Sequence, residues 1–529
     1  MNLKSRLPIL DWLLNYNKKY FKGDLNAGIT VGIMLIPQGM AYAMLAGLPP
    51  IYGLYAAIVP QLIYAILGTS RQLGVGPVAM DSLLVAVTVG ELAKAGSDSY
   101  ISIAILLAFL VGAIQLLLGF LRLGFLVNFL SHPVISGFTS AAALIIGFSQ
   151  LKYLMGVDLE RSQFLHEILW SAGQHLTEIN PFAFAIGVGG IVLLLVLKRM
   201  KPAFPAPLAV VTGGIVVVWW FSLAQYDVAI VGAIPSGLPH FSIPDWNIEW
   251  VGKLWSSALT IALVAFMEAI AVAKAIHARH QDYKIVPNQE LIALGMSNLV
   301  GSLFQSFPGT GGFSRSAVND QAGAKTNLAA IISAVFIMCV LLFLTPLFFF
   351  LPKAVLASII MVAVFKLISI QDAVDLWRKG YAQDFGILII TFLATLSIGI
   401  QNGILIGVLV SIVGMLYQSL HPTIRVEKQS KNLWIIHYKG FLYFGNSQYF
   451  KESMEAILAS YKGTHLVLNG VGMSSMDSTG EKALESIKNT CQTKVVKLTF
   501  IDLPKSSLHP NTTSNTNLDT IYDKEHLVV

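Results

Sequence analysis

The stretch Gly295–Lys325 reads GMSNLVGSLFQSFPGTGGFSRSAVNDQAGAK and decides how this chain can fold. It is broken by glycine and proline, lies between two long apolar runs, and carries Ser314 and Arg315 near its centre. Unpaired backbone groups inside a bilayer are costly by several kcal/mol each unless they line a cavity within the protein. An arginine at that depth is also costly and commonly marks a functional site. Because helix N-termini attract anions, the stretch predicts an anion pocket at a helix start.

The composition indicates a membrane domain followed by a more polar domain. The 529 residues are 55% hydrophobic and 12% charged, whereas soluble domains carry about 25% charged residues. Of the 64 charged residues, 22 lie in 421–529. The run Phe385–Ile424 holds no charged residue over 40 positions, which is enough for two spans of about 20 residues. We predict a segment on the membrane surface (1–24), a transmembrane domain (25–420) and a cytoplasmic domain (421–529).

Several classes of protein are disfavoured. Cys339 and Cys491 are too few for a disulfide framework, and we interpret both as unpaired. We expect no signal peptide, since the first 24 residues mix aromatic residues with lysines and resemble an amphipathic helix on the membrane surface. The net charge of +6 fits basic loops better than nucleic-acid binding. We find no glycine loop for ATP, no metal cluster and no catalytic constellation in the sequence, so we expect no cofactor, no metal and no enzyme activity.

Apolar segments fill most of the first 420 residues, and we expect fourteen transmembrane segments, with a polar stretch at 163–176 on the surface. Their ranges are 25–45, 51–68, 74–93, 100–121, 132–154, 183–198, 206–222, 253–276, 288–304, 312–323, 327–350, 353–369, 383–399 and 402–419. Basic loops on one side predict that both termini are cytoplasmic in a multi-pass protein of the cytoplasmic membrane. Lys94, Lys152, Arg161 and Lys353 lie on the other side, against this trend.

Two segments are unusually short and interrupted. One reads LGVGPVAMDS over Leu73–Ser82, and the other reads FPGTGGFSR over Phe307–Arg315. They are third and tenth in order, which is the spacing expected of two inverted repeats of seven segments. In such repeats, broken helices meet near the midplane with their electropositive N-termini at the solute. The predicted fold is an α-helical polytopic membrane domain made of two inverted seven-segment repeats.

The polar tail has a different pattern. Leu433–Tyr438, Leu466–Leu468 and Val495–Phe500 have the composition of strands, and helical stretches at 447–461 and 479–490 separate them. This alternation predicts a soluble α/β domain.

Several motifs resemble the SulP family of anion permeases. Pro37–Ala43 (PQGMAYA) is similar to the family's first-helix motif, and Pro50–Ala57 (PIYGLYAA) is similar to the signature that follows it. Gly76–Ala79 and Gly312–Asn319 resemble the third and tenth segments of the family, and the tail resembles a STAS domain. The resemblance covers nearly the whole chain. It implies fourteen segments in a core and a gate subdomain, a homodimer, and anion transport by an elevator-like movement of the core.

The resemblance places seven residues at an anion pocket. Taken alone, most have plainer interpretations: Gln38 and Tyr42 could bond neighbouring helices, and Arg315 could pair with a carboxylate or reach the membrane surface. A helix that begins near Gly312 would direct its free N–H groups and the Ser314 hydroxyl at an oxyanion. The predicted substrate-binding residues are Gln38, Tyr42, Val78, Ala79, Phe313, Ser314 and Arg315.

Two carboxylates lie within these segments. Glu268 is surrounded by apolar residues, where a carboxylate readily binds a proton. Family members with a glutamate at this position resemble proton-coupled transporters, and the alanine and valine neighbours are poor sodium ligands. The alternative is a structural pair with Arg315 or Lys274. Asp81 departs from the uncharged residue usual in the family, and we interpret it either as a second coupling residue or as a group facing cytoplasmic water.

In the tail, Ser478 lies in a loop that resembles the phosphorylated loop of STAS proteins. A phosphate there would add about two negative charges at a helix start, but we favour an N-cap role for this serine. Regulation by phosphorylation or by a cytoplasmic partner of the tail is a secondary hypothesis. We interpret His277 and His280 as loop charges.

The leading functional hypothesis is secondary active transport of a small inorganic anion across the bilayer, namely proton-coupled sulfate symport. The alternatives are bicarbonate or dicarboxylate transport or exchange, coupling to sodium, and a passive channel or anion sensor that signals through the tail.

Overall fold

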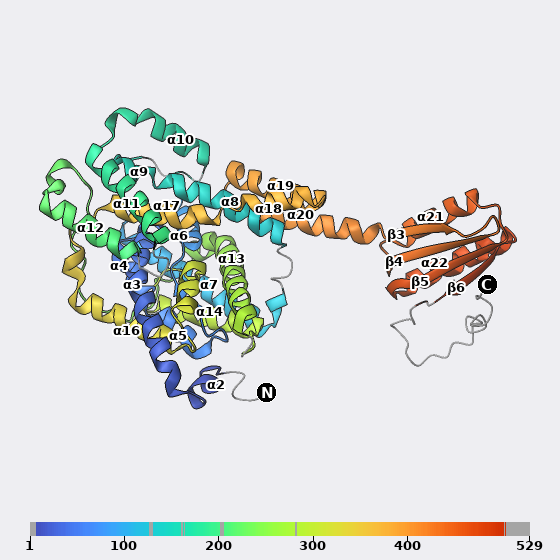
Figure 1. Cartoon of the computed structure of the whole chain (residues 1–529), viewed down its shortest axis with the longest axis horizontal. Coiled ribbons are helices and arrows are strands. Elements are labelled where there is room, and N and C mark those ends of the chain that lie inside the picture. The colour runs from blue at the N-terminus through green and yellow to red at the C-terminus, as the bar shows by residue number, and fades with distance from the viewer. Residues whose placement is uncertain are drawn as a thin grey trace. The chain divides into compact units, whose positions relative to one another are not determined.

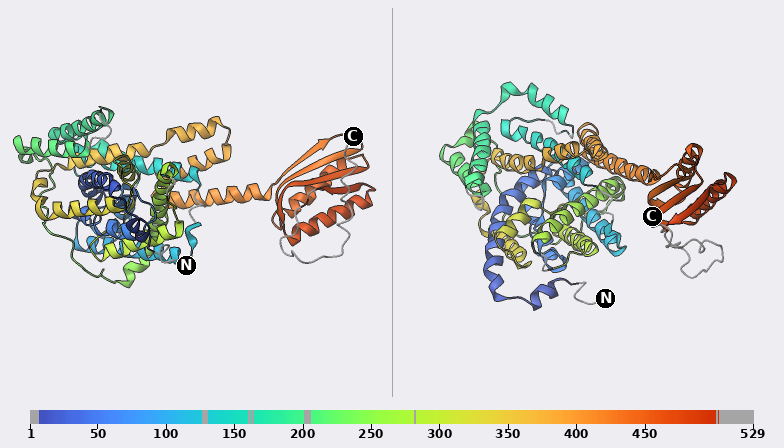
Figure 2. Two further views of the ribbon diagram at one scale, coloured as in Figure 1. Left: turned by 60° about the horizontal axis from the view of Figure 1, so that its bottom comes forward. Right: turned by 45° about the vertical axis from the view of Figure 1, so that its right-hand side comes forward.

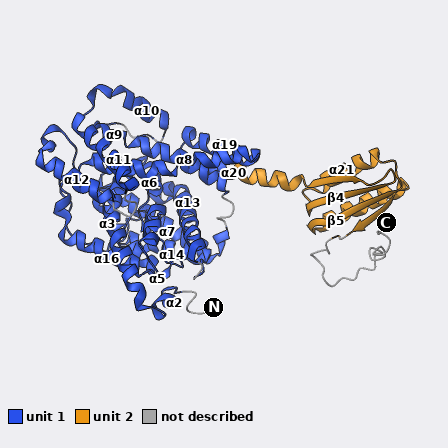
Figure 3. Cartoon of the chain, in the orientation of Figure 1, with its two compact units in different colours: residues 1–408 blue, residues 409–529 orange. Residues whose placement is uncertain are grey.

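The structure, a computed structural model, describes residues 7–125, 131–159, 162, 164–200, 206–280, 283–501 and 503. The chain forms two compact units, residues 1–408 and residues 409–529, each with its own hydrophobic core (Figures 1 and 3). The first unit is helical and the second is an α/β domain.

The first unit is a bundle of helices (Figures 1 and 2). It holds one small two-stranded sheet. Before the sheet lie α2 (Ile9–Leu14), α3 (Phe21–Leu45), α4 (Pro50–Tyr55) and α5 (Val59–Leu67). Between its strands β1 (Val75–Gly76) and β2 (Thr310–Gly311) lie α6 (Ala79–Gly90), α7 (Asp98–Phe120), α8 (His132–Ser149), α9 (Leu151–Met155), α10 (Leu165–Gln174), α11 (Pro181–Met200), α12 (Ala206–Trp220), α13 (Ile248–His280) and α14 (Pro287–Ser302). After β2 follow α15 (Phe313–Gln321), α16 (Leu328–Phe343), α17 (Lys353–Val364), α18 (Ile370–Arg378), α19 (Ala382–Ile398) and α20 (Ile400–Leu420), in which the unit boundary falls. Short 3-10 helices lie at Lys18–Tyr20 (η1), Leu176–Glu178 (η3), Leu223–Tyr226 (η4), Thr345–Phe348 (η5) and Phe365–Leu367 (η6).

Among the residues that the structure describes, eight helical segments are long and apolar enough to cross a bilayer, and four apolar helices are shorter. The predicted number of fourteen segments is therefore not confirmed. The clearest difference is at 312–323, where α15 has only nine residues. At 1.5 Å per residue, a helix of this length reaches less than halfway across a hydrocarbon core of about 30 Å.

The N-terminal segment differs from the single amphipathic helix predicted over 1–24. Its described part forms α2 and the 3-10 helix η1, and α3 already begins at Phe21. The break has a local cause, because the side chain of Asn17 accepts a hydrogen bond from the backbone N–H of Lys19 at 3.0 Å. Such side-chain bonds compete with the helical backbone pattern.

Glycines let the helices of the first unit approach closely. A Cβ on Gly53 of α4 would lie 1.9 Å from the carbonyl oxygen of Gly39 in α3. A Cβ on Gly112 of α7 would lie 2.5 Å from the backbone nitrogen of Leu299 in α14. In a bilayer, where close packing drives helix association, small residues at a crossing allow the backbones to touch.

The second unit contains a four-stranded sheet in the order β3-β4-β5-β6, which confirms the predicted α/β domain. Its elements are β3 (Thr423–Lys428), β4 (Leu433–Leu442), α21 (Ser447–Ser460), β5 (His465–Met476), α22 (Ser478–Thr493) and β6 (Lys497–Ile501). β3 and β4 are antiparallel, the other neighbours are parallel, and α21 contacts α22. The sequence did not predict β3, and β5 is longer than predicted because its second half pairs with β4 despite glycine and serine residues.

Candidate functional site

The two broken segments meet in the interior of the first unit. β1 and β2 pair in an antiparallel ladder, with Val75 opposite Gly311 and Gly76 opposite Thr310. Each strand leads directly into a half-helix, β1 into α6 and β2 into α15. Because the ladder is antiparallel, the two half-helices leave it in opposite directions, and their N-termini lie side by side. A Cβ at Gly309 would lie 2.9 Å from the Gly76 carbonyl oxygen, so this approach requires glycine.

Neither half-helix has a capped N-terminus. The N-caps are Val78 and Gly312, both with extended backbone, and neither provides a side-chain oxygen to the first turn. The first bonds of the helical pattern are donated by the N–H groups of Ser82 and Ser316. The first three N–H groups of each helix therefore have no partner within the described residues. Such groups, reinforced by the helix dipole, form a site for an anion.

Arg315 is the third residue of α15 and is only 1% exposed. Its Nε donates to the carbonyl of Gly74 at 3.2 Å, its Nη1 to that of Pro77 at 2.8 Å, and its Nη2 to that of Thr310 at 3.3 Å. The guanidinium thus ties the strand entering α6 to the strand entering α15. Its burial excludes the membrane-surface interpretation, and among the described residues its hydrogen bonds go to backbone carbonyls rather than to a carboxylate. These three bonds use three of the five N–H donors of the guanidinium and leave two. Its positive charge lies beside the N-termini of both α6 and α15.

The remaining predicted binding residues border the junction, by which we mean the β1–β2 ladder and the N-termini of α6 and α15. Gln38 and Tyr42 lie one turn apart on α3, which contacts both α6 and α15. Both are nearly buried, and Tyr42 lies within electrostatic range of Arg315 and Glu268. The Val78 and Ala79 side chains are also buried. In contrast, Phe313 is 57% exposed and Ser314 is exposed, so described residues of this chain do not cover these two side chains at the start of α15.

Helix α13 packs against β2, α6 and α15 on another side of the junction. The Thr310 hydroxyl donates to the carbonyl of Ala265 at 2.7 Å, which holds β2 against α13. Glu268 lies one turn further along the same face of α13. Its Oε2 is buried without a hydrogen-bond partner in the described structure, and the carboxylate lies within electrostatic range of Arg315.

Asp81 is fully buried in the first turn of α6. Neither carboxylate oxygen has a hydrogen-bond partner in the part of the chain that the structure describes, and Glu268 lies within electrostatic range. The interpretation that Asp81 faces cytoplasmic water is wrong, because its side chain is fully buried.

The buried carboxylate of Glu290 in α14 shows how a structural acid differs from Asp81 and Glu268. It accepts hydrogen bonds from the Tyr64 hydroxyl at 2.7 Å, from the Thr69 backbone and hydroxyl at 2.7 and 2.5 Å, and from the Ser70 backbone at 3.3 Å. Buried acids of this kind are stabilised by their donors. The contrast separates Asp81 and Glu268 from acids that only hold the fold together.

Sequence reasoning missed residues that support the junction. The Asn298 Oδ1 accepts from the backbone N–H of Gly309 at 2.9 Å. The Ser316 hydroxyl accepts from the N–H of Gly74 at 2.9 Å and donates to the carbonyl of Gly312 at 2.8 Å. Their only sequence signal is a small polar side chain within a buried segment.

Two minor predictions are wrong. His277 and His280 lie in the last turns of α13 rather than in a loop, and the His280 Nε2 lies 2.5 Å from Asp320 Oδ1 of α15. Ser478 is the exposed first residue of α22, whereas the N-cap is Asp477. The Asp477 Oδ1 accepts from the N–H groups of the second and third helical residues at 3.0 and 2.8 Å, and this occupies the capping position.

Comparison with known families agrees with the fold. The model described as Sulfate permease family matches residues 21–391, and that of the STAS domain matches residues 424–526. "Sulfate transporter 4.1, chloroplastic" of Arabidopsis thaliana is 38% identical over 548 positions, covering 96% of this chain and 79% of that protein. The "Sodium-independent sulfate anion transporter" of Bos taurus is 39% identical over 460 positions, covering 80% of this chain and 74% of that protein.

Solved structures match as well. The structure of the murine Solute Carrier 26 family member A9 anion transporter in the inward-facing state matches with a TM-score of 0.85 and 27% identity, over 94% of this chain and 88% of that one. The transmembrane domain of a cyanobacterium bicarbonate transporter, BicA, matches with a TM-score of 0.64 over 75% of this chain and 98% of that one. At 21% identity, the second match concerns the fold alone. The predicted helical transporter fold with a C-terminal STAS domain is confirmed.

Proposed function

The chain belongs to the sulfate permease family, and on that premise we propose that it is a secondary active transporter that carries sulfate across the cytoplasmic membrane. The observation that carries this proposal is the pair of uncapped helix N-termini joined by the β1–β2 ladder. The names of the plant and bovine relatives, which describe sulfate transporters, support sulfate as the substrate.

The charge at the junction suits a divalent oxyanion. Each helix N-terminus is equivalent to roughly +0.5 elementary charge, so two N-termini and the guanidinium of Arg315 together provide roughly +2. The free N–H groups of Ala79 and Phe313 and the hydroxyl of Ser314 are the proposed direct donors. Gln38, Tyr42 and Val78 form the remaining walls. Arg315 acts chiefly through its field, because much of its hydrogen-bonding capacity is used by carbonyls.

Proton coupling follows from the same charges. An ionised Glu268 would offset about half of this positive field, whereas a protonated Glu268 leaves it intact for the dianion. Proton binding and sulfate binding therefore favour each other. Asp81, buried and without a bonded partner, is proposed as the second carboxylate of this pair. The bovine relative's name, sodium-independent, argues against sodium as the coupling ion.

We further propose that the site moves as one piece. The ladder, the three Arg315 bonds and the bond from the Gly312 N–H to the Gly74 carbonyl at 3.0 Å join both half-helix tips. Such a joined unit suits an elevator-like movement of the core. A homodimer and a cytoplasmic location of both termini complete the proposal, and gel filtration and terminal tagging test them.

The test measures uptake of labelled sulfate into proteoliposomes, with and without an inward proton gradient. The wild-type protein should accumulate sulfate only with the gradient, and Glu268→Gln should abolish accumulation while retaining sulfate binding. Glu290→Gln is a matched control for removal of a buried carboxylate charge, and it should retain gradient-driven accumulation in the fraction that folds. Downhill flux without accumulation by the wild-type protein would support a channel, and binding without flux would support a sensor.

A further inference from the structure

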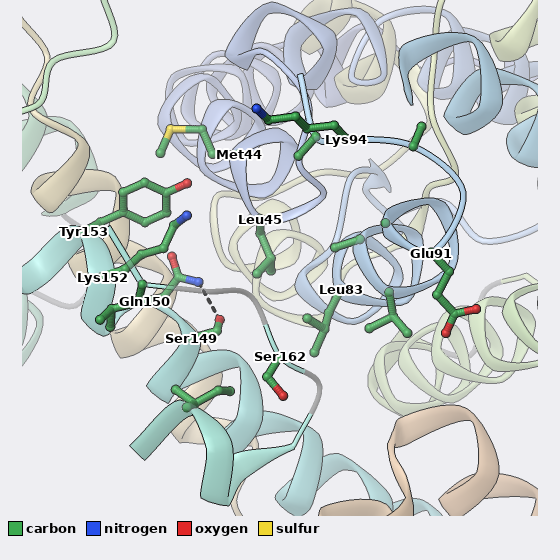
Figure 4. Close-up of a pocket in the computed structure, with 17 residues that line it drawn as sticks. Met44, Leu45, Leu83, Glu91, Lys94, Ser149, Gln150, Lys152, Tyr153 and Ser162 are labelled. Atoms are coloured by element: carbon green, nitrogen blue, oxygen red, sulfur yellow. Dashed lines mark hydrogen bonds between the residues drawn. The ribbon is translucent and has the colours of Figure 1, made fainter. Parts of the chain in front are cut away.

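A cavity separate from the junction lies where the far ends of α3 and α6 meet α8, α9 and α10 (Figure 4). Its volume is about 330 Å³. A cavity of this volume holds several water molecules. A small oxyanion could therefore enter it with most of its hydration shell.

The charged residues of this cavity are Glu91, Lys94 and Lys152. Figure 4 shows Glu91 across the cavity from both lysine ammonium groups. Neither ammonium takes part in an ion pair among the residues that the structure describes, and that of Lys152 lies 4.7 Å from the centroid of the Tyr153 ring. Both lysines run against the distribution of basic residues along the chain, so membrane topology does not account for them.

A buried polar group also faces this space. Gln150 lines the cavity, is 2% exposed, and donates through Nε2 to the Ser149 hydroxyl at 2.9 Å. Its Oε1 is buried without a partner within the described residues.

The floor of the cavity lies close to the candidate site. Leu83 of α6 follows Ala79 by one helical turn, and Leu45 of α3 follows Tyr42 by three residues. Both leucines line the cavity and are nearly buried. One turn of helix, about 5.4 Å, therefore separates the cavity floor from the residues of the site.

From this arrangement we propose that the cavity is an outer vestibule, a second anion-binding site in which Lys94 and Lys152 collect the hydrated oxyanion close to the candidate site. The inference rests on the proposed transport function. With both termini in the cytoplasm, α3 and α6 end on the external side, and the vestibule opens there. Lysines in a concave site raise the local concentration of an anion and speed its capture.

The test compares initial rates of labelled sulfate uptake by intact cells at low ionic strength. Lys94→Gln with Lys152→Gln should raise KM for external sulfate about three- to tenfold and leave the maximal rate unchanged. Glu91→Gln should lower KM, because it removes the opposing charge. Raising the salt concentration should reduce both differences, since the Debye length shortens to about 8 Å at 0.15 M.

Two controls make the result specific. Lys253→Gln removes a lysine near the same end of the domain that pairs with Glu249 and does not line the cavity, so its KM should stay at the wild-type value. In inside-out vesicles, where sulfate enters from the other end, the double variant should also keep the wild-type KM. A wild-type KM and salt dependence for the double variant in cells would overturn the vestibule and leave the proposed function standing. A wild-type protein that carries no anion would overturn both.

Discussion

Removing a single backbone donor from the first turn of α6 should weaken sulfate binding without harming the fold. Ala79→Pro achieves this, because proline at the first helical position removes only an N–H that the helix does not use. The N–H of Ala79 has no hydrogen bond among the described residues. The preceding residue, Val78, has φ −130° and ψ 155°, which is the extended conformation that a following proline requires.

The expected increase in Kd for sulfate follows from the kind of hydrogen bond that is lost. A hydrogen bond to a charged group contributes about 1.5–3 kcal/mol, and 1.4 kcal/mol is a factor of ten in affinity. Loss of one N–H donor to the dianion should therefore raise Kd about 10- to 150-fold. Titration calorimetry of the purified protein with sulfate measures this change directly.

Two controls accompany the measurement. Ala79→Gly keeps the N–H and should bind sulfate within a few-fold of wild type. Asp98→Pro changes the first residue of α7, which follows the extended N-cap Ser97 with φ −77° and ψ 157°, and should leave Kd unchanged. A folded Ala79→Pro protein with wild-type affinity would refute the idea that the free N–H groups of α6 hold the anion.

Three further predictions follow from the same structure. Ser314→Ala combined with Arg315→Ala should lower sulfate affinity at least tenfold by calorimetry, and unchanged affinity in the folded double variant would place the anion elsewhere. Gly53→Ala should lower the thermal midpoint in detergent, because its Cβ would lie 1.9 Å from a carbonyl oxygen of α3 and overpacking costs about 1–3 kcal/mol or more; Gly189→Ala, which meets nothing within 4 Å, should not lower it. Asp477→Ala removes the cap of α22 and should destabilise the second unit by about 1 kcal/mol, measured by denaturant unfolding of the tail; an unchanged midpoint would show that the cap contributes nothing.

The general plan of the membrane domain was readable from local sequence, but its boundaries were not. Glycine and proline in two short apolar segments predict broken helices, because these residues interrupt helical hydrogen bonding wherever they occur. Asp24, in the first turn of α3, accepts from the backbone N–H groups of Lys325 and Thr326 at 2.7 and 3.0 Å. A contact with residues so distant in sequence leaves no local signal.

The candidate site was only partly predictable, because some of its contacts join residues that are distant in the sequence. The positions around Ala79 and Ser314 were predicted from the glycine and proline residues of their segments and from the family resemblance. The pairing of the two segments agrees with the prediction that the broken helices meet. The partners of Arg315 were not predictable, since Gly74 and Pro77 precede it by more than 200 residues. Nor could the sequence distinguish Glu290, which accepts four hydrogen bonds, from Asp81, whose carboxylate accepts none in the described structure.

The sequence by itself determined that this chain lies in a membrane, that two of its segments are broken, and that its tail is an α/β domain. These properties depend on the transfer of side chains from water and on backbone preferences, which act residue by residue. Only the tertiary structure decided that the broken segments form one ladder, that Arg315 joins both strands, and that Lys94 and Lys152 line the same cavity. Such arrangements depend on how helices far apart in the chain pack together, and packing is a property of shape in three dimensions.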